Sequence, residues 1–211
     1  MRPLAKFISG AFHPLLFPTY GLLLLISTNP NRFGHFGEKL HVVWLIIVFA
    51  LTFVFPMVWL LMMKQLQMID SLSLETTKDR IVPFIATATF YLWTTWMFKS
   101  NVHLKIPTDK LIFLMMLGCS FTIFLGLIMN IWMKVSLHTM AAGNLLGIIL
   151  PIIQSSPYDL RIVFVAIILL AGFVGAAQLL LKEHDEREVY IGYFLGFTAQ
   201  FVSFTIVPLV L

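Results

Sequence analysis

Seven long runs of apolar residues are the feature that most limits how this chain can fold. A hydrocarbon core about 30 Å thick is crossed by a helix of about 20 apolar residues, and helices satisfy their own backbone hydrogen bonds in lipid. The 211 residues are 59% hydrophobic and only 11% charged, whereas soluble domains are about 25% charged. The sequence therefore predicts an all-α integral membrane protein. Its predicted helices cover about residues 9–27, 41–64, 82–98, 110–133, 138–153, 161–181 and 189–211.

The first run leaves the number of transmembrane helices open at six or seven. It is interrupted by glycines and prolines, which kink or end helices, at Gly10, Pro14, Pro18 and Gly21. The run is either a kinked span or a re-entrant hairpin. In both cases the basic residues divide almost evenly between the two faces, so the positive-inside rule does not orient the chain. The breaks between runs are short and no repeat appears, so we expect one membrane domain over residues 1–211.

Composition argues against several classes of function. Lys and Arg number 14 against 10 Asp and Glu, but they are scattered, so we expect no nucleic-acid binding. The single cysteine, Cys119, lies inside an apolar run and excludes an intrachain disulfide and a multi-cysteine zinc site. No His-Glu-x-x-His motif occurs, and no two histidines lie three or four residues apart. We therefore expect neither a metal nor another cofactor.

Ionisable residues gather at two boundaries between apolar and polar sequence, around His138 and around His184. An even number of runs separates these boundaries from each other and from the break at residues 65–81. All three boundaries therefore lie on one membrane face, whichever way the first run is interpreted. Two imidazoles, a carboxylate, a hydroxyl and several cations are expected to converge there, namely those of Lys78, Arg80, Lys134, Ser136, His138, Lys182, His184 and Glu188.

These groups suit phosphoryl transfer. A neutral imidazole is a nucleophile near neutral pH, and a protonated one donates a proton to a leaving group. A carboxylate beside the nucleophile fixes its tautomer, while lysine and arginine neutralise phosphate charge. His13, inside the interrupted first run, is either a partner at a helix kink or a further neighbour of this site.

The segment from about residue 76 to residue 200 resembles the type 2 phosphatidic acid phosphatases. The third motif of that family reads Ser-Arg, five residues, His, three residues and Asp, followed by a helix that contains two glycines. Here Ala177-Gln178 is followed after five residues by His184 and then by Glu188. The run 189–196 resembles the closing helix, with both glycines in place.

The other two motifs of the family have weaker counterparts. The second motif, Pro-Ser-Gly-His, is similar to residues 135–138, which read Val-Ser-Leu-His. The first motif, a lysine upstream of Arg-Pro, is echoed by Lys78, Arg80 and Pro83. The largest departure is Gln178, which is uncharged where the family has an arginine that clamps phosphate.

The resemblance implies a role for each residue of the site. His184 would be the nucleophile that forms a phosphohistidine, Glu188 would orient it, and His138 would protonate the leaving alcohol. The remaining residues would bind the phosphate, with two lysines compensating for the charge that the glutamine lacks; they are Ser136, Arg80, Lys78, Gln178, Lys134 and Lys182. The family uses no metal.

We therefore expect a metal-independent membrane phosphatase that hydrolyses a lipid-borne phosphate or diphosphate monoester. Its partners would be this lipid phosphate and the surrounding membrane lipids. The resemblance favours a site that faces outward from a bacterial cytoplasmic membrane. Two alternatives stay open. One is a non-catalytic protein that binds a lipid phosphate or scaffolds a membrane enzyme, which Gln178 and Leu137 favour. The other is a small transporter, for which the central runs are poor in charge.

Overall fold

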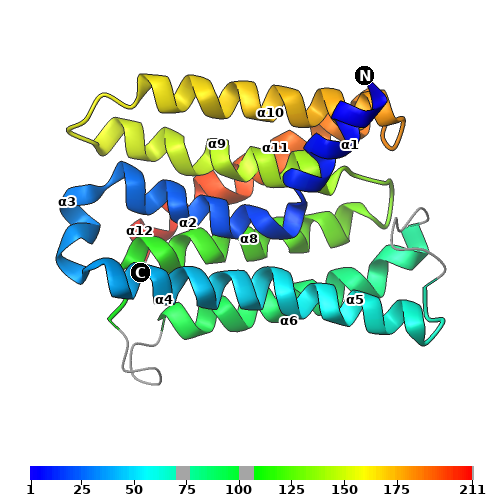
Figure 1. Ribbon diagram of the computed structural model, residues 1–211, viewed down its shortest axis with the longest axis horizontal. Coiled ribbons are helices and arrows are strands. Elements are labelled where there is room, and N and C mark those ends of the chain that lie inside the picture. Colours follow the sequence, from blue (N-terminus) through cyan, green and yellow to red (C-terminus); the bar gives the residue numbers. More distant parts are fainter. Residues whose placement is uncertain (70–76, 100–106, 211) are drawn as a thin grey trace.

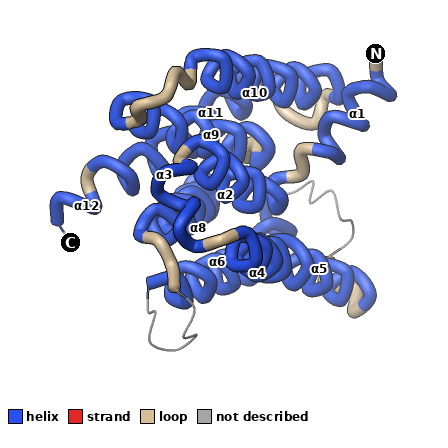
Figure 2. Tube along the Cα trace, turned by 60° about the vertical axis from the view of Figure 1, so that its left-hand side comes forward, coloured by secondary structure: helices blue, strands red, loops and turns tan. Residues whose placement is uncertain are grey.

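The computed structural model describes residues 1–69, 77–99 and 107–210, which form helices with no β-strand among them (Figures 1 and 2). Seven helical segments are long and apolar enough to cross a membrane. The prediction of an all-α membrane bundle is therefore confirmed. The seven segments are Arg2–Thr28, Glu38–Gln65, Asp79–Lys99, Lys110–Met129, Leu137–Ser155, Arg161–Leu181 and Glu186–Leu209.

The first segment is kinked and runs from one end of the bundle to the other (Figure 1). It consists of α1 (Arg2–Ala11), a 3-10 turn (Pro14–Leu16) and α2 (Phe17–Thr28). The kink has a local cause. Pro14 has no backbone N–H to continue α1, and the side chain of His13 caps the turn by accepting a hydrogen bond from the N–H of Leu15 at 3.4 Å. Helix α1 begins seven residues before the predicted start, with Pro3 in its first turn, where proline is tolerated.

The other spans agree closely with the predicted runs. The second combines α4 (Glu38–Phe49) and α5 (Phe55–Gln65) through a π-helical turn at Ala50–Val54. The long helices that follow are α6 (Thr77–Lys99), α8 (Lys110–Met129), α9 (Leu137–Ser155), α10 (Arg161–Leu181) and α11 (Glu186–Thr205). Of two short helices, α3 (Pro30–Phe33) follows the first span, and α12 (Val207–Val210) lies at the end of the last one.

Two further predicted boundaries are wrong, and both lie beside the candidate site. Helix α6 begins at Thr77 instead of residue 82, so Arg80 belongs to its first turn. Helix α8 ends at Met129 instead of residue 133, because residues 130–133 form turns that redirect the chain towards α9. The first turn of α6 is polar, so the apolar run begins after the helix does. Apolar residues follow the end of α8, so the apolar run continues beyond the helix.

Helix α9 lies at the centre of the bundle, in contact with α2, α8, α10 and α11 (Figures 1 and 2). In its most apolar window 61% of the residues are buried, against 22% in the second span, which therefore faces lipid. Helices α4, α5 and α6 form the side of the bundle opposite α10 in both views. The N-terminus and the ends of α5, α8 and α10 lie at one end of the bundle (Figure 1).

Glycines let α9 and α11 approach each other at backbone distance. A Cβ atom added at Gly196 would lie 1.8 Å from the carbonyl oxygen of Met140, and one at Gly143 would lie 2.4 Å from that of Tyr193. Small residues at such positions are the usual basis of close helix packing in membranes. The close approach places the start of α9, with His138, beside the start of α11, with Glu188.

We expect Gly196→Ala to destabilise the protein, because the added methyl group collides with backbone and not with a movable side chain. Overpacking of this kind costs about 1–3 kcal/mol. The measurement is thermal unfolding in detergent. The matched control is Gly172→Ala on α10, where nothing lies within 4 Å of the added Cβ. Equal unfolding temperatures for the two variants would show that α9 and α11 can separate at little cost.

Candidate active site

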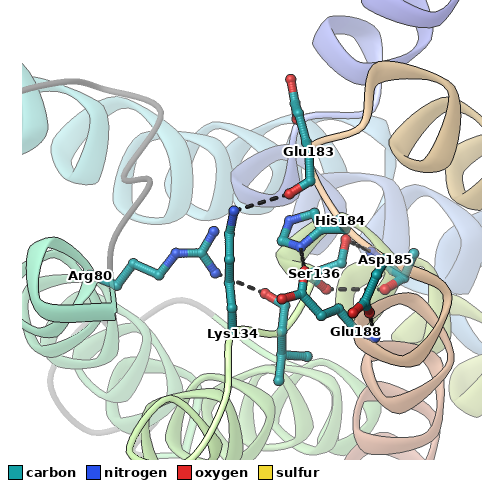
Figure 3. A network of polar contacts seen from close by, with 9 residues as sticks. Arg80, Lys134, Ser136, Glu183, His184, Asp185 and Glu188 are labelled. Carbon is teal, nitrogen blue, oxygen red and sulfur yellow. Dashed lines mark hydrogen bonds and ion pairs between the residues drawn. The ribbon is translucent and has the colours of Figure 1, made fainter.

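Polar side chains from three parts of the chain meet at the end of the bundle that holds the N-terminus. Figure 3 shows Arg80 reaching from α6 towards Lys134 and Ser136, which precede α9, and towards His184 and Glu188 at the start of α11. Lys134 donates from Nζ to the carbonyl oxygen of Glu183 at 3.0 Å. The predicted convergence of these segments at one boundary is thus present in the folded chain.

His184 and Glu188 form the tightest polar contact of this cluster. His184 Nδ1 lies 2.5 Å from Glu188 Oε2, and the side chains are only 6% and 17% exposed. The arrangement follows from local sequence. Asp185 is the N-cap of α11, and its carboxylate accepts the N–H of Glu188 at 2.8 Å. The cap holds His184 just outside the helix and turns Glu188, four residues later, back towards it.

His184 is neutral at physiological pH. Burial lowers its pKa from an ordinary value near 6.5 to about 3, assisted by the positive charges of Lys134 and Arg80 and opposed by Asp185. A carboxylate oxygen accepts hydrogen bonds, so Nδ1 of the neutral ring carries the proton and donates it to Glu188. The other ring nitrogen, Nε2, therefore keeps a lone pair. This is the protonation state that a histidine nucleophile needs.

The depressed pKa predicts how His184 responds to pH. In the unfolded chain a histidine takes up a proton near pH 6.5, while in the folded protein His184 does so only near pH 3. This residue therefore makes the folded state progressively less stable as the pH falls from about 6.5 to 3. An NMR titration in detergent, with the ring signal assigned through His184→Gln, should show no change between pH 8 and 5. A midpoint near 6.5 in the folded protein would contradict the burial argument.

Arg80 and Ser136 brace the segments around His184. Arg80 is 5% exposed and donates from Nη1 to the carbonyl oxygen of Val135 at 2.9 Å. The N–H of Ser136 donates to the carbonyl oxygen of Glu188 at 3.4 Å. The Ser136 hydroxyl is fully buried and caps α9 by accepting the N–H of Thr139 at 3.5 Å. In this structure the serine therefore holds backbone in place.

A cavity of about 240 Å³ opens beside these residues. Its lining includes three histidines, a cation and an acid from four segments, namely His13, His138, His184, Arg80 and Glu183, and Thr122 and Asn144 add uncharged polar groups. The cavity continues along one face of α6, where it is lined by Arg80, Pro83, Phe84, Thr87 and Tyr91. Eleven residues of helix correspond to about 16 Å, so the cavity extends from the membrane boundary to the middle of the bundle.

The remaining predicted residues lie outside the cavity. Lys134, Lys182 and Glu188 line a shallow depression on the surface, which His184 and Glu183 also border. Lys182 ends α10 in a left-handed conformation with φ 58°. His184 thus stands between the enclosed cavity and the open depression. The side chain of Lys78 lies outside the described residues.

His138 is held by a residue that the sequence analysis did not identify, Ser9 of α1. Nε2 of His138 lies 3.1 Å from the carbonyl oxygen of Ser9 and 3.2 Å from its hydroxyl. Gln178, fully buried on α10, donates from Nε2 to the same hydroxyl at 3.2 Å. Ser9 lies in the same interrupted first run as His13, and its position as a polar residue just before the interruption is the signal that could have identified it.

His13 combines the two roles that the sequence left open. Its Nδ1 caps the turn at the kink, and its ring lines the cavity. The ring centroid lies 6.1 Å from that of His138, in an edge-to-face arrangement. The kink of the first span therefore delivers a third imidazole to the cavity. In the part of the chain that the structure describes, no three His, Cys, Asp or Glu side chains are grouped so as to hold a metal ion.

No protein-family model, curated protein or solved structure matches this chain. The resemblance to type 2 phosphatidic acid phosphatases therefore rests on the motif residues alone. The geometry around His184 is the feature of the structure that bears most directly on function.

Proposed function

We propose that this protein is a membrane phosphatase that hydrolyses a lipid-borne phosphate monoester through a phosphohistidine. The observation that carries the proposal is His184: a neutral, buried ring, hydrogen-bonded through Nδ1 to Glu188, that lines one cavity with Arg80 and His138. A nucleophile, an orienting acid, a second imidazole and a cation are the groups that phosphoryl transfer requires. The resemblance of the motifs is consistent with the same reaction.

The first chemical step forms the phosphoenzyme. Nε2 of His184 attacks phosphorus with its lone pair, and the bond between phosphorus and the lipid alcohol oxygen breaks. The departing oxygen takes the Nδ1 proton of His138, which enters this step as the doubly protonated imidazolium and leaves it neutral, while Glu188 stabilises the positive charge that the phosphorylated ring acquires. Arg80 at the cavity wall offsets the negative charge of the phosphoryl group.

The second step releases inorganic phosphate. A water oxygen attacks phosphorus, the N–P bond breaks, and His138 takes the proton of the water. His184 borders the open depression as well as the cavity, which gives water and phosphate a route separate from the lipid alcohol. The cavity lining is mostly apolar, with Phe84, Ile123 and Met140 among its side chains, which suits the first part of the lipid chain. We propose that the site faces outward from the membrane.

The test is phosphate release by the purified protein in detergent. Dodecyl phosphate is supplied with a chelator present, and inorganic phosphate is measured over time. A rapid-quench sample should contain a phosphoprotein that is labile in acid and stable in alkali, as expected of a phosphoramidate. Release that needs no metal, together with this intermediate, supports the proposal. Release abolished by the chelator would replace it with metal-dependent hydrolysis.

A non-catalytic protein that binds lipid phosphates is the second candidate. One observation favours it: Gln178, at the position of the arginine clamp in the family, is buried against Ser9 and does not line the cavity. The cavity then has one charged clamp fewer, and a lost charged hydrogen bond costs about 1.5–3 kcal/mol. This candidate predicts that dodecyl phosphate raises the unfolding temperature of the protein without any phosphate being released.

A further inference from the structure

The contact between α1 and His138 joins residues 129 positions apart in the sequence. It is made by both the backbone and the side chain of Ser9, and the same side chain receives the amide of Gln178. Ser9 does not line the cavity, whereas His138 does. Ser9 therefore contacts the ring from outside the cavity.

We propose that Ser9 is a positioning residue, which holds the ring of His138 so that its other nitrogen serves the leaving group. The proposal rests on the proposed function, since it concerns the acid of the same reaction. It assigns a role in catalysis to the N-terminal helix, which lies outside the segment that resembles the phosphatase family.

The kink in the first span makes the Ser9 carbonyl available. A carbonyl inside a helix accepts from the N–H four residues later, and for Ser9 that residue is His13. Helix α1 ends at Ala11, so His13 lies beyond it and caps the next turn instead. The carbonyls of a last helical turn need partners from elsewhere, and they carry the negative end of the helix dipole. Here the imidazole of His138 meets that need.

The contact also selects which nitrogen of His138 carries out chemistry. A carbonyl oxygen only accepts hydrogen bonds, so the nitrogen facing it, Nε2, carries a proton. Among the described residues Nδ1 of His138 has no hydrogen-bond partner, which leaves it for the substrate and water. The Ser9 carbonyl thus fixes the tautomer of His138, as the Glu188 carboxylate fixes that of His184.

Gln178 fits this arrangement as a neutral partner of Ser9. It is fully buried, and its amide nitrogen donates to the Ser9 hydroxyl. An arginine here would place a buried positive charge beside the ring that must become positive to act as an acid, and like charges that close repel strongly. The departure from the family motif at this position and the docking of α1 are therefore explained together.

The experiment compares two substrates whose leaving groups differ in their need for a proton. Dodecyl phosphate releases an alkoxide, which needs one, and 4-nitrophenyl phosphate releases a stabilised phenolate, which does not. The first turnover is measured for wild type, Ser9→Ala and Ser9→Thr, with Ser27→Ala as the matched control. Ser27 lies in the same span and bonds only to backbone of its own helix.

We expect Ser9→Ala to slow the first turnover of dodecyl phosphate about tenfold, the effect of one hydrogen bond, with KM within about twofold. The nitrophenolate burst should change less than about twofold. Ser9→Thr, which keeps the hydroxyl, should restore the alkyl ester rate, and Ser27→Ala should match wild type. The ratio of the two rates does not depend on how much of each variant is folded.

Three outcomes overturn the proposal. If both substrates slow equally, Ser9 only supports the fold. If neither slows, the Ser9 side chain does not position His138 for the reaction, while the phosphatase function stands. If the wild-type protein cleaves neither substrate, the proposed function fails and the role of Ser9 fails with it.

Discussion

Replacing His184 with alanine is expected to abolish phosphate release from dodecyl phosphate, with a loss of at least about a thousandfold. The neutral ring, with its Nδ1 proton directed to Glu188, is the only protein group in the proposed reaction that forms a bond to phosphorus. The acid-labile phosphoprotein should disappear in the same variant. Initial rates and rapid-quench labelling measure the two effects separately.

A matched control distinguishes loss of the nucleophile from loss of the fold. His35 is exposed in the connection after α3, so His35→Ala should retain wild-type activity. Thermal unfolding of His184→Ala in detergent should remain close to that of the wild type. If the variant keeps its phosphoenzyme and its activity, phosphorus is attacked by another group, and the assignment of His184 is wrong.

Glu188→Gln should produce the second large effect, a loss of about a thousandfold to ten-thousandfold. The magnitude is that of the corresponding Asp-to-Asn change in a serine protease triad. A carboxylate can only accept from Nδ1 at this short distance, whereas an amide can also donate to it. Donation by the amide would move the ring proton to Nε2 and remove the lone pair that attacks phosphorus. The measurement is kcat for dodecyl phosphate.

Two further variants define the cause of that loss. Glu188→Asp keeps the charge and supplies the residue found in the family motif, so it should retain most of the activity. Glu186→Gln removes an exposed carboxylate from the same first turn of α11 and should have little effect. If Glu186→Gln and Glu188→Gln were equally damaging, the net charge of the turn would matter and the tautomer of His184 would not.

Most of the fold follows from hydrophobic run length and from local turn chemistry. Long apolar runs have to form helices in lipid, and the seven spans observed lie close to the seven runs. The number of crossings between boundaries placed His138, His184 and Arg80 at one end of the bundle. The pairing of His184 with Glu188 is equally local, because Asp185 caps the helix that carries the carboxylate.

The rotation of each helix about its axis could not be predicted in this way. Helix α8 is apolar on nearly all sides, so its sequence indicates that it crosses lipid but not which side faces the bundle. Rotation decides whether a side chain at the correct depth points into the cavity or away from it. Ser136 and Gln178 were predicted to bind phosphate, yet they contact backbone and Ser9, whereas His13 lines the cavity.

By itself the sequence determined that this is a bundle of apolar helices with two histidines, a carboxylate and several cations at one membrane boundary. These conclusions need only run length, crossing number and helix capping, all of which can be read along the chain without knowing which distant segments touch. Only the tertiary structure decided that His138 is held by Ser9 and that Gln178 completes the contact. Those partners are brought together by the close packing of α9 against α11 and by the kink that turns α1 over the site, and both depend on contacts between distant segments.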